Sequence, residues 1–535
     1  MKPTCVHHFL ERHAQRRPES VLVVEGDRQT SYGAIDAAAN RIAHALIGQG
    51  VEKGDRIGLL AVNSTSYIEA YYGILKAGAI CVALNTAADW RTHCELLARC
   101  RAKGLLCGST VGRCAAGIDA IHDLEFILGD AALWCGKLPA DCPIRCLDWH
   151  DLSESMASDA PHVSLAPGDR AAIVYTSGST GEPKGVTLRH ANLVANTESI
   201  VTYLRLTAED RALVVLPFPY VYGKSLLNTH VAVGGSVVIE NRFLFPQQAL
   251  DTLEATRATG LSGVPSTFAI LLNRSNFASR DLPHLRYVTQ AGGAMAPEMQ
   301  RRLIDALPGK EIFIMYGATE ASARLAYLHP RDLPKKIGSI GKAIPGVDLR
   351  VLRENGTDAD TDRVGELVAS GENLMEGYWD DPAGTAEVLD ADGYHTGDLA
   401  RRDADGFFYI VGRKREMIKS GAHRIAPMEI EEALVEHPRI DEAAVIGLPD
   451  EILGEAIGAF ITPRPGESPV SGDIIRWCKG RLPSYKVPHR VEVVSQFRRN
   501  ASGKIDKQSL RTWIPDVDDP LPAGTNLVSA GNAQA

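Results

Sequence analysis

The residues best suited to do chemistry lie in a loop, rich in glycine and hydroxyl side chains, that follows an apolar strand. Residues 171–185 read AAIVYTSGSTGEPKG, so a short apolar run leads straight into the loop. Glycine lets backbone N–H groups approach an anion closely, hydroxyl groups add donors, and a lysine adds positive charge. The pattern predicts a cradle for a polyphosphate, formed by Thr176, Ser177, Gly178, Ser179, Thr180, Gly181 and Lys184.

The spacing of this loop excludes the commoner phosphate and nucleophile motifs. It fits neither the G-x-x-x-x-G-K-[ST] of a Walker A loop, nor the G-x-G-x-x-G dinucleotide fingerprint, nor the G-x-S-x-G nucleophile elbow. A solvated Ser/Gly turn would account neither for the strand before the loop nor for the Pro-Lys-Gly after it. The loop instead resembles the signature of the adenylate-forming superfamily, which includes acyl-CoA synthetases, firefly luciferase and the adenylation domains of nonribosomal peptide synthetases.

Further motifs of this superfamily follow in its usual order, and the resemblance covers roughly residues 10–512. In the family, the tyrosine matching Tyr316 lies against adenine, and the threonine matching Thr319 reaches the α-phosphate. The glutamate matching Glu320 helps to hold Mg²⁺, an ion that takes few protein carboxylates and keeps phosphate oxygens as ligands. A core tyrosine would explain Tyr316 but not its neighbours. The resemblance therefore implies ATP contacts from Tyr316, Gly317, Thr319 and Glu320.

Two other segments resemble the parts of the family that hold the nucleoside. Asp398 ends the run GYHTGD, and a carboxylate can accept hydrogen bonds from both ribose hydroxyls. Arg413 ends the run DGFFYIVGR and would also contact the ribose. The run QAGGA resembles the segment whose backbone contacts adenine, and its glycines would allow a close approach. The adenine contacts implied are Gly292, Gly293 and Ala294.

The C-terminal motifs imply a mobile domain with a catalytic lysine. The run ASGKID at 501–506 resembles the lysine element of the family and makes Lys504 the candidate. The domain hinge of the family falls on Arg415, where Asp or Lys is more usual. Lys419 and Gly421 match a loop that nears the active site in the second half-reaction of relatives, and a plain surface turn is the alternative.

The resemblance implies an acyl-CoA synthetase-like, AMP-forming acid–thiol ligase. In the first half-reaction the substrate carboxylate attacks the α-phosphorus of ATP and releases pyrophosphate. Catalysis of such a step rests on alignment and charge neutralisation. Mg²⁺ near Glu320, the loop from Thr176 to Lys184, and Lys504 would supply both. In the second half-reaction the acyl group passes to a thiol, either of CoA or of the phosphopantetheine on an acyl or peptidyl carrier protein.

A helix after the run LPFPYVYGKS at 216–225 is expected to line the acyl pocket, because this run resembles the motif beside that pocket. Many relatives have His or Phe where Tyr220 stands. Lys224 and Asn228 are four residues apart and could share a helix face. If they face the pocket, the acid is polar or bears a second charge; otherwise they point to solvent or cap neighbours. The predicted substrate pocket consists of Tyr220, Lys224, Asn228, His230 and Gln290.

Several functions remain open at this point. The first is a CoA ligase for a small or medium carboxylic acid, and the second is a ligase that loads a carrier protein. A catalytically inactive homologue that only binds is a third, which the intact Glu320, Asp398, Arg413 and Lys504 argue against. A luciferase-like oxygenase is a fourth, since the fold does not fix the second half-reaction.

The elements that must position these residues alternate between strands and helices. Short apolar runs at 213–216, 236–239 and 312–315 are predicted strands whose ends hold polar residues, the edge where ligands bind in open α/β sheets. We expect an α/β fold in which a large multi-subdomain N-terminal domain has sheets covered by helices, and a hinge joins it to a small α+β domain. The predicted boundaries are 1–412 for the N-terminal domain, 413–416 for the hinge, 417–513 for the C-terminal domain and 514–535 for a disordered tail.

The bulk properties agree with an enzyme of several domains that acts on small molecules. The chain has 535 residues, 45% of them hydrophobic and 23% charged, the composition of a soluble globular protein. Its net charge of −9 argues against a nucleic-acid partner. Neither a membrane span nor a secretory signal is expected, because no apolar run is long enough and the N-terminus lacks an apolar region. The ten cysteines include no C-x-x-C pair, which favours reduced thiols in a cytoplasmic protein.

Overall fold

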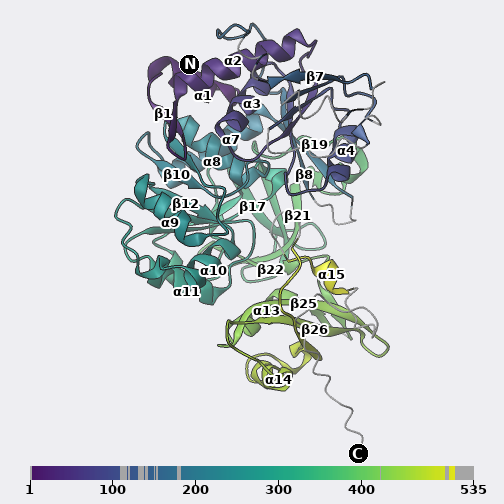
Figure 1. Cartoon of the computed structure of the whole chain (residues 1–535). Helices are drawn as coiled ribbons and strands as arrows, with labels where there is room; N and C mark the ends of the chain where they lie inside the picture. Colours follow the sequence, from purple (N-terminus) through teal and green to yellow (C-terminus); the bar gives the residue numbers. More distant parts are fainter. Residues whose placement is uncertain are drawn as a thin grey trace, which may run out of the picture.

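The architecture is that of a large N-terminal part and a smaller C-terminal part. The structure, a computed structural model, describes residues 3–108, 117–118, 121–129, 138, 142–149, 151, 155–176, 182–421, 423–499 and 505–511. Sheets covered by helices form the large part, and another sheet with its own helices forms the small part below it (Figure 1). The α/β fold class predicted from the sequence is confirmed. The predicted tail at 514–535 lies outside the described residues.

The first sheet of the large part carries the predicted phosphate loop between two of its strands. Its strands lie in the order β19-β9-β8-β4-β3-β5-β6-β7, and all pairs are parallel except β8–β9 and β9–β19. Thr176 and Lys184 lie opposite each other where β8 and β9 meet the loop. The strands are β3 (Arg56–Leu60), β4 (Ile80–Ala83), β5 (Gly104–Cys107), β6 (Phe126–Gly129), β7 (Arg145–Asp148), β8 (Arg170–Thr176), β9 (Lys184–Arg189) and β19 (Gly377–Tyr378).

The second sheet delivers the predicted adenine and metal motifs at the ends of adjacent parallel strands. Its order is β16-β15-β14-β13-β12-β10-β11-β1-β2, with parallel pairing from β1 through to β14. Gln290 ends β13 and Tyr316 ends β14 beside it. The strands are β1 (Val21–Glu25), β2 (Arg28–Ser31), β10 (Arg211–Val214), β11 (Ser236–Ile239), β12 (Gly260–Gly263), β13 (Tyr287–Gln290), β14 (Glu311–Tyr316), β15 (Ala326–Leu328) and β16 (Lys342–Ala343).

A third, antiparallel sheet delivers the predicted ribose motif. Its strands lie in the order β17-β18-β21-β20, and β22 pairs with β21 so that Asp398 lies opposite Arg413. Figure 1 shows β21 and β22 leading down to the C-terminal part. The strands are β17 (Val347–Leu352), β18 (Gly365–Gly371), β20 (Leu389–Asp390), β21 (Gly393–Arg402) and β22 (Phe408–Arg413).

Capping side chains or prolines mark the start of several helices of the large part. The Ser31 hydroxyl accepts a hydrogen bond from the backbone N–H of Ala34, and the Asp89 carboxylate accepts one from Thr92. Helix α8 ends at Gly234, whose φ of +79° suits glycine. The helices are α1 (His7–Arg16), α2 (Tyr32–Gly48), α3 (Thr65–Lys76), α4 (Trp90–Arg99), α7 (His190–Leu204), α8 (Val221–Val233), α9 (Pro246–Ala255), α10 (Pro265–Arg274), α11 (Pro297–Ala306) and α12 (Pro382–Ala386), with 3₁₀ turns η2 (Phe277–Ser279), η3 (Thr319–Ala321) and η4 (Leu333–Lys335).

The C-terminal part follows the α+β pattern expected from the sequence. Its sheet has the order β24-β23-β26-β25 with β27 beside β26, and α13 begins at a proline, which has no N–H to leave unpaired. Ile430, Leu434 and Ile474 pack against the sheet in a core separate from that of the N-terminal part. The elements are β23 (Ile418–Ser420), β24 (His423–Ile425), α13 (Pro427–Val435), β25 (Ile440–Asp450), β26 (Gly454–Pro463), α14 (Ser471–Lys479), η5 (Ser484–Lys486), β27 (Arg490–Val493) and α15 (Lys507–Arg511).

The main core of the large part packs both parallel sheets against the helices between them, and a buried lysine ties three of its helices together. Lys76 ends α3, and its side chain is 1% exposed. Its Nζ lies 2.9 Å from Glu11 on α1 and 2.7 Å from Asp36 on α2, and it donates a hydrogen bond to Asn40. Two carboxylates and an amide oxygen surround this buried cation and offset the cost of removing it from water.

No helix within the described ranges combines the length and the apolar character needed to cross a bilayer.

Replacing Lys76 by Met should destabilise the N-terminal part, because Glu11 and Asp36 would lose their shared cation. We expect the free energy of unfolding to fall by about 3 kcal/mol in urea denaturation. Lys53→Met is the matched control, because the ion pair of Lys53 with Asp169 is half-exposed and should contribute less than about 1 kcal/mol. Equal losses in the two variants would contradict this account of the core.

Candidate active site

A buried carboxylate joins three strands of two sheets. Asp398 on β21 is 5% exposed. Its Oδ2 accepts a 2.6 Å hydrogen bond from the Tyr316 hydroxyl at the end of β14, and its Oδ1 lies 2.9 Å from Nε of Arg413 on β22. The structure thus brings together Tyr316, Asp398 and Arg413, which were predicted from separate motifs.

The pKa values of Tyr316 and Arg413 show that both side chains stay protonated beside Asp398. Burial and the neighbouring carboxylate raise the pKa of Tyr316 well above its ordinary value, so its hydroxyl keeps its proton and donates. The Asp398 carboxylate raises the pKa of Arg413. Each carboxylate oxygen can accept more than one hydrogen bond, so Asp398 keeps lone pairs for the hydroxyls of a ligand.

The predicted metal ligand lies beside the predicted phosphate lysine, and a tyrosine stands between them. Glu320 is in η3, and its Oε1 accepts a 2.8 Å hydrogen bond from the Tyr378 hydroxyl. The Nζ of Lys184 lies 4.7 Å from the centre of the Tyr378 ring and 3.9 Å from Asp381. Sequence reasoning missed Tyr378, because its position depends on the pairing of β19 with β9, which no local spacing reveals.

The glycines of the predicted adenine segments allow close backbone packing. A Cβ on Gly317 would lie 1.9 Å from the carbonyl oxygen of Ala323, so only glycine fits between β14 and the following turn. Gly292 has a φ of +84°, and the segment from Gly292 to Ala294 is exposed. Gln290 is buried and donates a 2.8 Å hydrogen bond to the Gly293 carbonyl, which holds this open backbone in place.

Two predicted elements fall outside the described residues. They are the centre of the phosphate loop, with Ser177, Gly178, Ser179, Thr180 and Gly181, and the catalytic lysine candidate, Lys504. The described residues on either side are placed. Thr176 pairs with Lys184 before and after the loop, and Arg499 forms a bridge with Ile505 next to the lysine motif.

The predicted pocket helix, α8, presents buried polar side chains. Lys224 is 9% exposed and Asn228 is 2% exposed, and both line a narrow cavity of about 20 Å³, room for one or two water molecules. The alternative that these two side chains point to solvent is therefore wrong. Tyr220 caps the helix and accepts a 2.8 Å hydrogen bond from Asn85, and burial raises its pKa to about 12.

His230 lies on the same helix but belongs to the packing of the core. It is 1% exposed, and its ring nitrogens lie 2.8 Å from the Leu226 carbonyl oxygen and 3.1 Å from the Tyr287 hydroxyl. Both polar atoms are therefore used inside the protein. The residues that line the cavity do not include His230, and we leave it out of the proposed site. Its spacing from Lys224 could not distinguish a pocket side chain from a core side chain.

The predicted hinge and thiol-step residues lie at and beyond the end of β22. Arg415 is exposed between β22 and β23. Lys419 is on β23, where its backbone N–H donates to the Glu455 carboxylate, and Gly421 follows with a φ of +58°. Within the part of the chain that the structure describes, no hydrogen bond or ion pair links Lys419 or Gly421 to the Tyr316–Asp398–Arg413 cluster.

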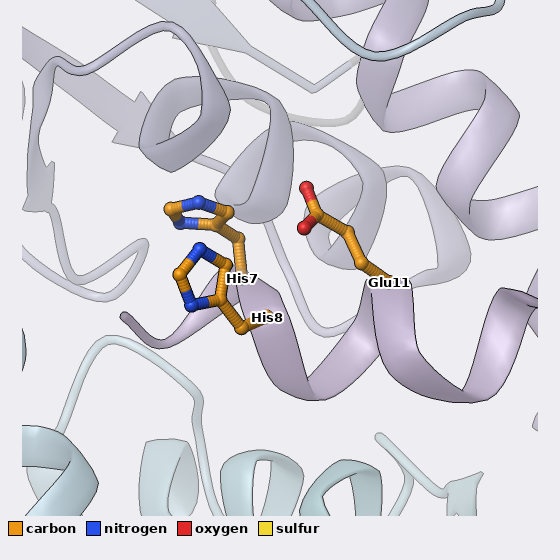
Figure 2. Close-up of side chains that lie close together, drawn as sticks. All are labelled: His7, His8 and Glu11. Carbon is orange, nitrogen blue, oxygen red and sulfur yellow. The ribbon is translucent and has the colours of Figure 1, made fainter. Parts of the chain in front are cut away.

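Among the described residues, one other group has the composition of a metal site. His7, His8 and Glu11 project from α1 and lie close together (Figure 2). Glu11 is already paired with Lys76, and Nδ1 of His8 accepts hydrogen bonds from the backbone N–H groups of Thr4 and Cys5. This group therefore serves the packing of α1 and is distinct from Glu320.

Comparison with known proteins gives a consistent result over both parts of the chain. Residues 10–379 match the family described as AMP-binding enzyme, and residues 429–504 match the AMP-binding enzyme C-terminal domain. An indoleacetate–CoA ligase from Aromatoleum aromaticum is 32% identical over 95% of this chain and 97% of its own length. A feruloyl-CoA synthase from an Amycolatopsis species is 32% identical over 94% and 97%.

Comparison with solved structures also identifies CoA ligases over nearly the whole chain. The anthranilate CoA ligase AuaEII in complex with anthranoyl-AMP superposes with a TM-score of 0.85 at 26% identity, over 95% of this chain and 96% of that one. The o-succinylbenzoate CoA synthetase MenE from Bacillus subtilis, in complex with ATP and magnesium ion, has a TM-score of 0.81 at 27% identity, over 94% and 98%.

The buried Lys224 should reduce stability, and the penalty should depend on pH. Burial lowers the pKa of Lys224 from 10.5 to about 7. The unfolded chain therefore binds this proton more tightly, so the penalty is full below pH 7 and fades as pH rises towards 10.5. Lys224→Met, similar in length but uncharged, should raise the free energy of unfolding, and the gain should be about 2 kcal/mol larger at pH 6.5 than at pH 9.

Urea denaturation of the wild type and this variant at the two pH values measures the difference directly, since all other titrating groups are common to both proteins. A gain that does not change with pH, or a loss of stability at both values, would show that Lys224 has a counter-ion in the folded protein.

Proposed function

Because the chain belongs to the AMP-binding enzyme family, we propose that the residues gathered at these strand ends bind ATP and adenylate a carboxylic acid. The protein is an AMP-forming acid–CoA ligase: it converts the acid to an acyl-AMP with release of pyrophosphate and passes the acyl group to CoA. The observation that carries the assignment of residues is the Tyr316–Asp398–Arg413 cluster, since it joins the predicted adenine and ribose motifs into one binding surface.

The nucleoside of ATP lies along this surface. The ring of Tyr316 and the exposed backbone from Gly292 to Ala294 flank the adenine, and the turn at Gly317 allows the close approach. The ribose hydroxyls donate to the buried carboxylate of Asp398, which Arg413 holds in place. Gln290 acts indirectly, by fixing the backbone of this segment.

The phosphates lie where β8 enters the loop. Thr176, Lys184 and the loop Ser177–Gly181 donate to the phosphate oxygens, and Thr319 reaches the α-phosphate. A single carboxylate, Glu320, fits Mg²⁺, which takes few protein ligands and keeps phosphate oxygens and waters. When bound there, Mg²⁺ would neutralise charge on the phosphates and help pyrophosphate to leave. Tyr378 orients Glu320 through its hydrogen bond and is a positioning residue.

In the first half-reaction an oxygen of the substrate carboxylate attacks the α-phosphorus. The new P–O bond forms as the bond from the α-phosphorus to the bridging oxygen of pyrophosphate breaks. Lys504 contacts both the incoming carboxylate and the α-phosphate, and its charge offsets their repulsion. No nucleophilic side chain is required, since the substrate is itself the nucleophile.

In the second half-reaction the CoA thiol, as thiolate, attacks the acyl carbonyl, and AMP leaves with the electrons of the broken C–O bond. The C-terminal domain, residues 417–513, rotates about the hinge at 413–416, where Arg415 is exposed. The rotation withdraws Lys504 and brings Lys419 and Gly421 to the site. CoA is favoured over the phosphopantetheine of a carrier protein, because the relatives named above are CoA ligases.

Lys504→Ala should abolish the first half-reaction while leaving the second. We expect ATP–pyrophosphate exchange, driven by an acid from a broad panel, to fall at least about 100-fold, as for loss of a charge that acts in the transition state. Release of acyl-CoA from supplied acyl-AMP should change little. Lys479→Ala, an exposed lysine of the same domain, is the control. Exchange that survives in Lys504→Ala would remove this lysine from the site.

Tyr378→Phe should slow adenylation and raise the Mg²⁺ concentration that it requires. Loss of one hydrogen bond to a charged group, worth about 1.5–3 kcal/mol, should lower the rate of adenylation about 10- to 100-fold. The Mg²⁺ concentration for half-maximal exchange should rise as well, because Glu320 would no longer be oriented. Tyr485→Phe, a half-exposed tyrosine stacked on His423, is the matched control. An unchanged Mg²⁺ requirement in Tyr378→Phe would contradict the positioning role.

A further inference from the structure

Lys224 is a buried cation in an aromatic cage. Its Nζ donates a 2.9 Å hydrogen bond to the Tyr67 hydroxyl. It lies 3.6 Å from the centre of the Tyr71 ring, 4.3 Å from that of Tyr67 and 5.8 Å from that of Phe218. Ring faces attract a cation, but they do not replace a counter-ion in a dry site.

No carboxylate within the described residues pairs with Lys224. The titratable groups that face it are Tyr67 and Tyr71 on α3 and Cys81 on β4, and burial raises the pKa of all three, so they stay neutral. Lys76, by contrast, is buried together with two carboxylates. The fold therefore supplies the counter-ions of Lys76, whereas a counter-ion for Lys224 would have to come from outside the chain.

The cavity beside Lys224 also contains unused polar groups. Asn228, one turn further along α8, and Asn196 on α7 both line it, and the side-chain oxygen of each lacks a hydrogen-bond partner in the described part of the protein. Asn228 also lies beside the Tyr71 hydroxyl. An amide can turn its NH₂ instead of its oxygen towards an anion, because the two orientations have nearly the same shape.

The cavity adjoins the proposed adenylation site. Ala172 and Val174 of β8 form one wall, and the same strand ends at Thr176. Ser322, which directly follows η3 with Glu320, lines it as well. The cavity has room for one or two water molecules, so it can take a small terminal group but not a whole carbon chain. The group that would enter it is the end of a substrate whose reacting carboxylate lies near the phosphate loop.

We propose that the acid activated by this enzyme is a dicarboxylic acid, whose second carboxylate is bound by Lys224 with help from Asn228. The inference rests on the proposed function. The ammonium group gains the counter-ion that the fold lacks, and the carbon chain runs from this second carboxylate past Ala172 and Val174 towards the phosphate loop. Arg324, buried 4.0 Å over the Tyr222 ring and also without a carboxylate partner among the described residues, adds positive potential near α8.

Matched pairs of acids test the proposal: butyrate with succinate, hexanoate with adipate, and benzoate with terephthalate. In ATP–pyrophosphate exchange the wild type should favour the best dicarboxylate over its partner at least about 100-fold in kcat/KM. In Lys224→Met, kcat/KM for that dicarboxylate should fall about 100-fold, mainly through a higher KM, and kcat/KM for the monocarboxylate should rise. Lys53→Met, an exposed lysine, should retain the preference of the wild type.

The pH dependence gives a second readout that a purely structural lysine would not produce. The ratio of kcat/KM for the dicarboxylate to that for its monocarboxylate partner should fall about tenfold per pH unit above pH 7 in the wild type, as free Lys224 loses its proton. In Lys224→Met this ratio should be independent of pH, and urea denaturation serves as the check that the variant is folded.

The possible results distinguish a failure of the dicarboxylate inference from a failure of the proposed function. The inference would be overturned, and the proposed function left intact, if exchange with a monocarboxylate equalled or exceeded exchange with every dicarboxylate. Monocarboxylates with an uncharged polar group at the far end, such as 4-hydroxybenzoate, belong to this comparison. A Lys224→Met variant that loses all acids equally would also overturn it. No exchange with any acid, by folded enzyme supplied with Mg²⁺, would overturn both.

Discussion

The proposed site depends on the burial of one carboxylate. Asp398 comes from an antiparallel sheet, and it becomes tolerable in the interior only because Tyr316 from the end of a parallel sheet and Arg413 from the neighbouring strand contact its two oxygens. The same contacts fix the distance between the proposed adenine and ribose surfaces. The short strand β19 has a corresponding role at the proposed phosphate site, since it places Tyr378 between Glu320 and Lys184.

Buried charge also separates structure from specificity in this chain. Lys76 is surrounded by its own carboxylates and holds helices together, whereas Lys224 has aromatic rings and a cavity instead. Both lysines are buried in the folded protein, so burial alone does not tell them apart. The two lysines differ in whether the chain supplies a counter-ion. Within the described residues Lys224 has no counter-ion, and it lies beside a cavity that adjoins the proposed reaction site, so the substrate is the best candidate for that counter-ion.

Much of this could be predicted from sequence, because the phosphate loop and the strand-end motifs are local. Thr176, Tyr316 and Asp398 were predicted from runs of neighbouring residues, and the strands that present Thr176 and Tyr316 were predicted within a few residues, whereas β21 around Asp398 was not predicted. Tyr378 could not be found, because its role arises from strand pairing between distant segments. Helical spacing on α8 placed Lys224 and Asn228 on one face but also suggested His230, whose ring nitrogens are used in the core. Spacing cannot tell which buried face meets a cavity.

The most direct test follows the oxygen atoms. The acid is labelled with oxygen-18 in its carboxylate and converted with ATP, Mg²⁺ and CoA, and the nucleotide product is examined by mass spectrometry. Attack of the carboxylate on the α-phosphorus leaves one carboxylate oxygen on AMP when CoA takes the acyl group, so the account predicts AMP carrying a single oxygen-18 and unlabelled pyrophosphate. Formation of ADP with labelled phosphate, or of AMP without label, would contradict it.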